Sequence, residues 1–148
     1  MTTTVDWLYS RHSVRFPTLK IAISEGGIGW VPSLLDRLDH HYAKQGDRRK
    51  VWAESELSAA EVLQRNFFFC LVDEPSAMCQ VDRIGIDNIL FETDFPHADS
   101  SWPDTQQLAD KHFADMPADV VRKITWENAS LLFRHPVPSA VQDDPEAF

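Results

Sequence analysis

The sequence feature that most limits the possible folds of this chain is a short apolar strand that ends in ionisable residues. Residues 88–91 suit a buried strand, and the chain then runs directly into Asp94, Pro96 and His97. In α/β proteins, ligands bind at the carboxyl ends of buried parallel strands, where such residues gather. We therefore expect the functional residues of this protein to lie in loops that follow strands.

Two further apolar segments have the length and composition of buried strands. Residues 19–24 stop at the glycine-rich turn 25–29, and residues 66–72 are apolar on both faces, as in a parallel strand covered by helices. A helix over residues 75–84, ended by Gly85, joins the second strand to the third. Three strands separated by helices predict an α/β fold with a parallel sheet.

Helical patterns account for most of the remaining chain. The helices expected from apolar spacing, capping residues and proline positions cover residues 2–12, 32–43, 58–65, 104–113, 117–123 and 125–133. Ser58 and Glu61 form a capping box, and Asp104 can cap the helix that places Leu108 and Phe113 inward.

Two segments outside these helices are polar. The charged residues 44–54 predict a surface excursion, and residues 135–148, which contain three prolines, predict a loose tail. Residues 1–134 then form the folded domain.

The composition narrows the class of protein. The chain has 148 residues, of which 43% are hydrophobic, enough for one modest domain with a core. Its formal net charge of -9 argues against a nucleic-acid partner, and no apolar run approaches the roughly 20 residues of a membrane span. Cys70 and Cys79 are too few to imply disulfides or a zinc site. We expect a soluble cytoplasmic protein that takes a small-molecule substrate.

Several short motifs occur in a characteristic order. They are residues 15–20 (Arg-Phe-Pro-Thr-Leu-Lys), 24–32 (Ser-Glu-Gly-Gly-Ile-Gly-Trp-Val-Pro), 93–97 (Thr-Asp-Phe-Pro-His), Trp102-Pro103 and 126–129 (Trp-Glu-Asn-Ala). In order and spacing they resemble the amidohydrolase superfamily, in the branch of small-acid hydrolases and decarboxylases related to aminocarboxymuconate-semialdehyde decarboxylase. The resemblance implies a TIM-type (β/α)8 barrel, of which this chain holds about the last three of eight strand–helix units.

Asp94 is the sharpest candidate residue. The resemblance implies that it is a metal ligand at the end of the last barrel strand, in a family whose divalent metal is zinc or manganese. A bound metal can lower the pKa of a coordinated water enough for attack at neutral pH. The residues alone slightly favour the alternative that Asp94 caps its own turn by accepting main-chain N–H bonds, and the resemblance favours the ligand position.

Glu25 and His97 are the candidates for proton transfer. The resemblance places Glu25 where the family's decarboxylases carry a histidine, and a glutamate can perform acid–base work if burial raises its pKa. Alternatively, Glu25 pairs with Arg15 or Arg37. His97 shares its loop with Asp94, so both side chains can face one pocket.

Three further residues are candidates for substrate contact. Arg37 can bind a substrate carboxylate with two parallel hydrogen bonds, although a helical arginine is more often a solvated charge. Trp30 and Trp102 can form apolar pocket walls, although core packing is the commoner role of tryptophan.

This sequence contains only part of the set of metal ligands that the family uses. The family's site also uses a His-x-His pair and a further histidine, and no His-x-His occurs in these residues. A single carboxylate holds a catalytic divalent ion poorly, so we expect weak or absent metal binding by this chain alone.

Three functions follow from these observations. The first is the carboxyl-terminal part of a metal-dependent hydrolase or decarboxylase, completed by an amino-terminal half or by self-association. The second is a non-catalytic remnant or binding module. The third, a metal-free glycosidase site, pairs Glu25 with Asp94.

Overall fold

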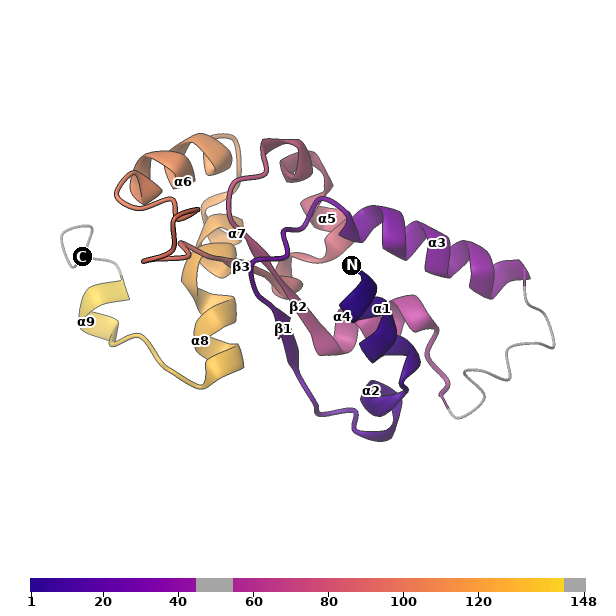
Figure 1. The fold of residues 1–148 in the computed structure, drawn as a ribbon. Coiled ribbons are helices and arrows are strands. Elements are labelled where there is room, and N and C mark those ends of the chain that lie inside the picture. The colour runs from indigo at the N-terminus through magenta and orange to yellow at the C-terminus, as the bar shows by residue number, and fades with distance from the viewer. Residues whose placement is uncertain (45–54, 143–148) are drawn as a thin grey trace.

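The computed structural model describes residues 1–44 and 55–142, which fold around a three-stranded parallel sheet (Figure 1). The strands are β1 (Ile21–Ile23), β2 (Phe67–Leu71) and β3 (Ile89–Phe91), in the order β1-β2-β3. Ile21 pairs with Phe67, and Phe69 pairs with Ile89. The predicted α/β fold with parallel strands is confirmed, and β1 is shorter than the expected residues 19–24.

Helices pack beside this sheet, and Figure 1 shows α3 and α4 to the right of it and α6 to α9 to the left. The helices are α1 (Thr2–Tyr9), α2 (His12–Arg15), α3 (Val31–Lys44), α4 (Ala59–Asn66), α5 (Val81–Ile84), α6 (Thr105–Phe113), α7 (Ala118–Arg122), α8 (Asn128–Phe133) and α9 (Ser139–Gln142). Short helical segments of other types are η2 (Pro75–Gln80), η3 (Ile86–Asn88) and the π-helical η4 (Lys123–Glu127). None of the helices in the described ranges is long and apolar enough to cross a membrane.

The core lies against one face of the sheet. Phe67, Phe69 and Leu71 alternate along β2, so they share a face, and all three are fully buried. They belong to one cluster with Leu35 of α3 and Leu63 of α4. Burial of this many large apolar side chains is the main source of stability in a domain of this size.

The start of α4 is set locally, as the sequence predicts. The Ser58 side chain accepts a hydrogen bond from the Glu61 N–H at 3.2 Å, and the Glu61 carboxylate accepts one from the Ser58 N–H at 2.7 Å. Hydrogen bonding of the Glu61 carboxylate by the Ser58 main chain, and to a smaller extent by the Ser58 side chain, lowers the pKa of Glu61 from its ordinary value. The capping box is therefore confirmed, and the helix leads directly into β2.

The amino ends of the strands are joined by the three asparagines of the chain, all of which are buried. Asn66 Nδ2 donates to the carbonyls of Pro17 and Leu19, just before β1. Asn88 Nδ2 donates to the carbonyls of Gln64 and Phe67, at 2.5 and 2.7 Å, where α4 meets β2. Asn128 Nδ2 donates to the carbonyls of Ile86 and Ile89, both at 2.8 Å, at the start of β3.

Each asparagine therefore reaches backward to an earlier segment. The carbonyls that they bind precede the sheet ladder or lie at its first residue, so the strand pairing leaves them without a full set of partners. Side-chain amides satisfy these buried acceptors and fix the spacing of the three strands where they begin.

The structure corrects three of the predicted helices. The helix expected over residues 2–12 is divided at Arg11, whose φ of 65° lies in the left-handed region. The crossover over residues 75–84 begins as a 3₁₀ segment and becomes α-helical only at Val81. The two helices expected over residues 117–133 form one continuous helical run through η4, where Thr125 Oγ1 donates to the Val121 carbonyl at 2.8 Å.

Two expectations at loop segments also change. Asp104 precedes α6 but its side chain makes no capping hydrogen bond. The tail expected to be loose from residue 135 contains the short helix α9. The excursion predicted over residues 44–54 begins at the last residue of α3, and the rest of it lies outside the described residues.

Replacing Asn88 tests whether its side-chain hydrogen bonds stabilise the amino ends of the strands. Asn88→Ala is expected to lower the free energy of unfolding by about 2 to 4 kcal/mol, because two main-chain carbonyls lose their side-chain donor. Urea unfolding followed by circular dichroism measures the change. Gln106→Ala on the exposed side of α6 is the control and should have almost no effect. Equal stability of Asn88→Ala and the unsubstituted protein would contradict this role.

Candidate functional site

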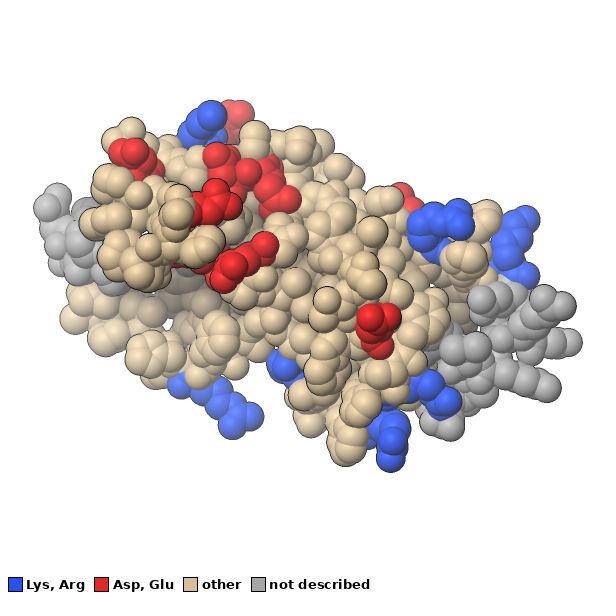
Figure 2. All heavy atoms as spheres, in the orientation of Figure 1, with Lys and Arg blue, Asp and Glu red and all other residues tan. Residues whose placement is uncertain are grey.

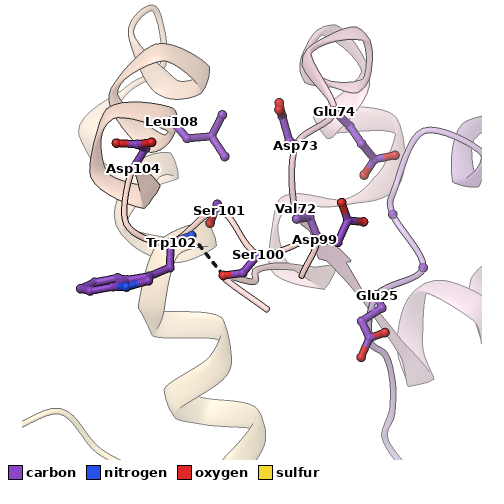
Figure 3. A pocket seen from close by; sticks show the side chains of 12 residues that line it. Glu25, Val72, Asp73, Glu74, Asp99, Ser100, Ser101, Trp102, Asp104 and Leu108 are labelled. Atoms are coloured by element: carbon purple, nitrogen blue, oxygen red, sulfur yellow. Dashed lines mark hydrogen bonds between the residues drawn. The ribbon is translucent and has the colours of Figure 1, made fainter. Parts of the chain in front are cut away.

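The loops that follow the three strands surround one hollow of about 630 Å³. The loop after β1 contributes Glu25, the loop after β2 contributes Asp73 and Glu74, and the loop after β3 contributes Asp99 and the residues up to Trp102. Figure 3 shows these side chains on several sides of the hollow, with Leu108 of α6 pointing in from the side opposite Glu74. The carboxyl edge of the sheet is thus where ionisable groups converge, as expected for an α/β protein.

Glu74 holds the loop that follows β1. Its carboxylate accepts hydrogen bonds from the main-chain N–H groups of Ile28 and Gly29, at 2.6 and 3.0 Å. Gly27, beside them, has a φ of 64° and no space for a side chain, because an added Cβ would lie 2.6 Å from Glu74 Oε1. The glycine is therefore needed for the carboxylate to approach the backbone.

Glu25 lies at the start of this loop and lines the hollow. Its φ of 54° places a non-glycine residue in the left-handed region. Its own N–H donates to Glu92 Oε2 at 2.8 Å. Of the residues proposed for proton transfer, Glu25 is the one that lines the hollow, and Figure 3 shows its carboxylate turned away from Asp73 and Glu74.

Asp94 and His97 form a pair within the loop that follows β3. Asp94 Oδ2 lies 3.0 Å from His97 Nδ1, with the aspartate side chain 13% exposed and the histidine 62%. The His97 N–H also donates to the Asp94 carbonyl at 2.8 Å. The Asp94 main-chain carbonyl therefore closes the turn, whereas the Asp94 side chain contacts the His97 ring, and neither residue is among those that line the hollow with Glu25.

The same loop is closed on itself. The Thr93 carbonyl accepts hydrogen bonds from the Ser101 N–H at 3.1 Å and from Ser100 Oγ at 2.8 Å. The chain therefore returns to its starting point after Ser100. In this closed loop, Asp99 is among the residues that line the hollow and Asp94 is not.

The three residues proposed for substrate contact are dispersed. Trp102 lines the hollow and is exposed, with its ring 5.6 Å from that of Phe95, and Figure 3 shows the indole pointing away from the acidic residues. Trp30 packs edge-on against Phe69 at 5.6 Å and donates through Nε1 to the Gly26 carbonyl. Arg37 is exposed on α3 beside His41 and does not line the hollow.

Sequence reasoning missed a second pair formed by a histidine and an aspartate. His112 of α6 is buried, with its side chain 2% exposed, and its Nε2 lies 2.9 Å from Asp73 Oδ1. Asp73 itself lines the hollow. Asp73 and Glu74 directly follow a buried strand, and this position could have indicated a functional role for them. The contact with His112 could not be inferred from the sequence, because the two residues are 39 positions apart.

The electrostatic character of the hollow is acidic. Five carboxyl side chains line it, namely Glu25, Asp73, Glu74, Asp99 and Asp104, and no Lys, Arg or His is found among the described lining residues. Figure 2 shows Asp and Glu gathered beside α6, whereas most Lys and Arg side chains lie elsewhere on that face. Carboxylates at this density repel one another and attract cations.

The acidic residues nevertheless do not make a metal site by themselves. Within residues 1–44 and 55–142, no group of three or more His, Cys, Asp or Glu side chains is arranged to hold a metal ion. The Asp94 carboxylate contacts His97, and the Glu74 carboxylate is occupied by two main-chain N–H groups. The described residues therefore do not fit a complete divalent-metal site.

Comparison with known proteins identifies the class. The sequence profile of the Amidohydrolase family matches residues 1–135, so the chain belongs to the amidohydrolase family. This confirms the resemblance inferred from the sequence motifs. A comparison with curated proteins gives no match.

Two solved structures share the fold. An amidohydrolase from Mycobacterium avium subsp. paratuberculosis K-10 matches with a TM-score of 0.72 and 24% identity, over 88% of this chain and 32% of that one. The 5-carboxyvanillate decarboxylase of Sphingomonas paucimobilis matches with a TM-score of 0.69 and 25% identity, over 90% of this chain and 39% of that one. The chain spans 32% and 39% of the length of these two proteins, and its small open parallel sheet corresponds to part of a TIM-type barrel.

Substitutions at the glycine turn test how tightly Glu74 holds the loop. Gly27→Ala is expected to be more destabilising than Gly29→Ala, because its φ is positive and its Cβ meets Glu74 at 2.6 Å instead of 3.3 Å. In a Glu74→Ala background the difference should shrink to about 1 kcal/mol, the cost of the left-handed backbone alone. Thermal unfolding of the four variants measures both values, and an unchanged difference would show that Glu74 does not crowd Gly27.

Proposed function

We propose that this chain supplies the last strand–helix units of a metal-dependent amidohydrolase-family enzyme, a hydrolase or decarboxylase acting on a small organic acid. The observation that carries the proposal is the convergence of ionisable side chains from three strand ends on one hollow. Family membership over residues 1–135 supports the class of enzyme. The structural likeness to a 5-carboxyvanillate decarboxylase supports an organic acid as substrate.

Glu25 is the proposed proton-transfer group, because it is among the residues that line the hollow and a carboxylate can accept and return a proton. His97 and Asp94 are proposed to act as a pair, with Asp94 offering one carboxylate to a divalent ion such as zinc or manganese. Trp102 is the proposed wall residue. Trp30 and Arg37 have weaker support, since Trp30 packs on the core and Arg37 lies away from the hollow.

The acidic lining has a consequence for the substrate. An organic acid carries a negative charge, and five carboxyl groups around the hollow would repel it. Counter-charge must therefore come from outside the described residues. The remaining strands of a barrel, together with the metal that they help to bind, would provide it.

The described residues favour one alternative for the chain in isolation, a non-catalytic folded unit. Its acidic hollow lacks a group that could hold a metal in the described ranges, and its core is well packed. The pairing of Glu25 with Asp94 as a glycosidase site has less support, because Asp94 does not line the hollow.

Metal content and turnover test the proposed function. The chain is prepared alone and together with the remaining barrel strands of the Sphingomonas decarboxylase. We expect weak zinc or manganese binding and little turnover by the chain alone, and stoichiometric metal with release of CO₂ or hydrolysis product in the assembled form. Elemental analysis and an assay on aromatic carboxylic acids measure both.

Substitution of the proposed ligand provides the matched control. In the assembled form, Asp94→Asn should lower activity by at least about 100-fold, because even loss of an outer-shell partner of a metal ligand costs about 10- to 100-fold. Asp115→Asn, an exposed aspartate between α6 and α7, should have no effect. Full activity of the chain alone would contradict the need for further strands, and full activity of Asp94→Asn would remove Asp94 from the site.

Self-association follows from the open sheet. Both outer strands, β1 and β3, have a partner on one side only in the described sheet, and unpaired strand edges promote association. We expect sedimentation velocity to show dimers or larger species that dissociate when the remaining barrel strands are supplied. A single monomeric species at all concentrations would contradict this expectation.

A further inference from the structure

The carboxylate of Glu92 joins two strands that do not touch each other. Glu92 follows β3, whereas the groups that it binds belong to the end of β1, and β2 lies between these strands. One carboxylate oxygen, Oε2, accepts from the Glu25 N–H at 2.8 Å, and the other accepts from the hydroxyl of Ser24. The side chain therefore passes over the carboxyl end of β2.

The Glu92 carboxylate also interacts with the thiol of Cys70 in β2. Cys70 is buried, and its burial, followed by the negative charge of Glu92 and a hydrogen bond to it, raises the pKa of the thiol to about 12. A neutral thiol can lie beneath the carboxylate without adding a second charge. Glu92 thus has a contact with each of the three strands.

The backbone of Glu25 shows why such a contact is needed. With a φ of 54°, Glu25 adopts a conformation that L-residues avoid because Cβ approaches the carbonyl oxygen. Glu74 holds the later part of this loop through Ile28 and Gly29, and makes no hydrogen bond to residues 24 or 25. Glu92 is therefore the group that stabilises the turn at the Ser24–Glu25 corner.

We propose that Glu92 is a positioning residue, which holds the Ser24–Glu25 corner in its left-handed turn and so keeps Glu25 at the edge of the hollow. This inference rests on the proposed function, in which Glu25 transfers protons. It assigns Glu92 no contact with the substrate, because Glu92 is not among the residues that line the hollow.

Hydrogen exchange of single amides tests the geometry without any need for turnover. Glu92→Ala should raise the exchange rate of the Glu25 amide by about tenfold, the effect of losing one charge-assisted hydrogen bond. The amide of Phe69, within β2, should keep its rate. Ser24→Ala removes only the hydroxyl contact and should change the Glu25 amide less, and Glu56→Ala, an exposed glutamate, is the control.

A charge-neutral variant supplies a second readout if Glu92→Ala does not fold. In a Cys79→Ser background, Glu92→Gln should lower the pKa of Cys70 from about 12, because the charge above the thiol is removed while its burial remains. The ultraviolet absorbance of the thiolate during a pH titration measures the shift. An unchanged pKa of Cys70, or an unchanged exchange rate of the Glu25 amide in Glu92→Ala, would overturn the proposal.

A general loss of stability would also overturn it. If Glu92→Ala accelerates exchange at Phe69 as much as at Glu25, the carboxylate stabilises the whole sheet and has no specific effect on the corner. An increase at Glu25 alone supports positioning.

Turnover in the assembled enzyme then tests the link to catalysis. Glu92→Ala should lower kcat with little change in KM, and should cause no further loss in a Glu25→Gln background, because both substitutions remove the same contribution. Additive losses would overturn the positioning role. Absence of turnover by the unsubstituted assembly would instead contradict the proposed function, while the exchange and thiol results would still decide where the Glu92 carboxylate lies.

Discussion

The rest of the structure depends on one constraint, the attachment of a very short parallel sheet at its two ends. Side chains make this attachment through hydrogen bonds to the main chain. β1 and β3 have three residues each, so the ladder itself provides few hydrogen bonds. At the amino ends, asparagine amides donate to main-chain carbonyls. At the carboxyl ends, Glu74 and Glu92 accept from main-chain N–H groups. Donors at one end and acceptors at the other match the backbone groups that the strands leave unpaired.

This arrangement explains how an acidic site is tolerated. Carboxylates close together destabilise a folded state through mutual repulsion unless hydrogen bonds or opposite charges compensate. Glu74 and Glu92 each accept two hydrogen bonds, and Asp73 lies beside His112. The remaining carboxylates are solvated at the edge of the hollow. The side chains that hold the loops in place therefore also supply much of the local negative charge.

Several features of the fold were predictable because their causes are local in sequence. The apolar run of β2 and the capping box of Ser58 and Glu61 each depend on neighbouring residues, and both appear as predicted. The break at Arg11 and the 3₁₀ start of the crossover were not predictable, because a non-glycine residue gives no local signal for a positive φ and η2 is irregular. Of the proposed site residues, Glu25 and Trp102 line the hollow, whereas Arg37 and Trp30 do not. An arginine or tryptophan near a strand end has the same local sequence whether it faces a pocket or packs on the core.

The sequence by itself determined the class of fold, the family and the region where functional groups gather, because apolar periodicity and motif order are properties of neighbouring residues. Only the tertiary structure decided which carboxylates share the hollow, that Asp94 pairs with His97, and that Glu92 reaches the corner of β1. Those contacts join residues that lie up to 68 positions apart. Their geometry depends on strand order and backbone conformation, which are fixed by packing of the whole domain.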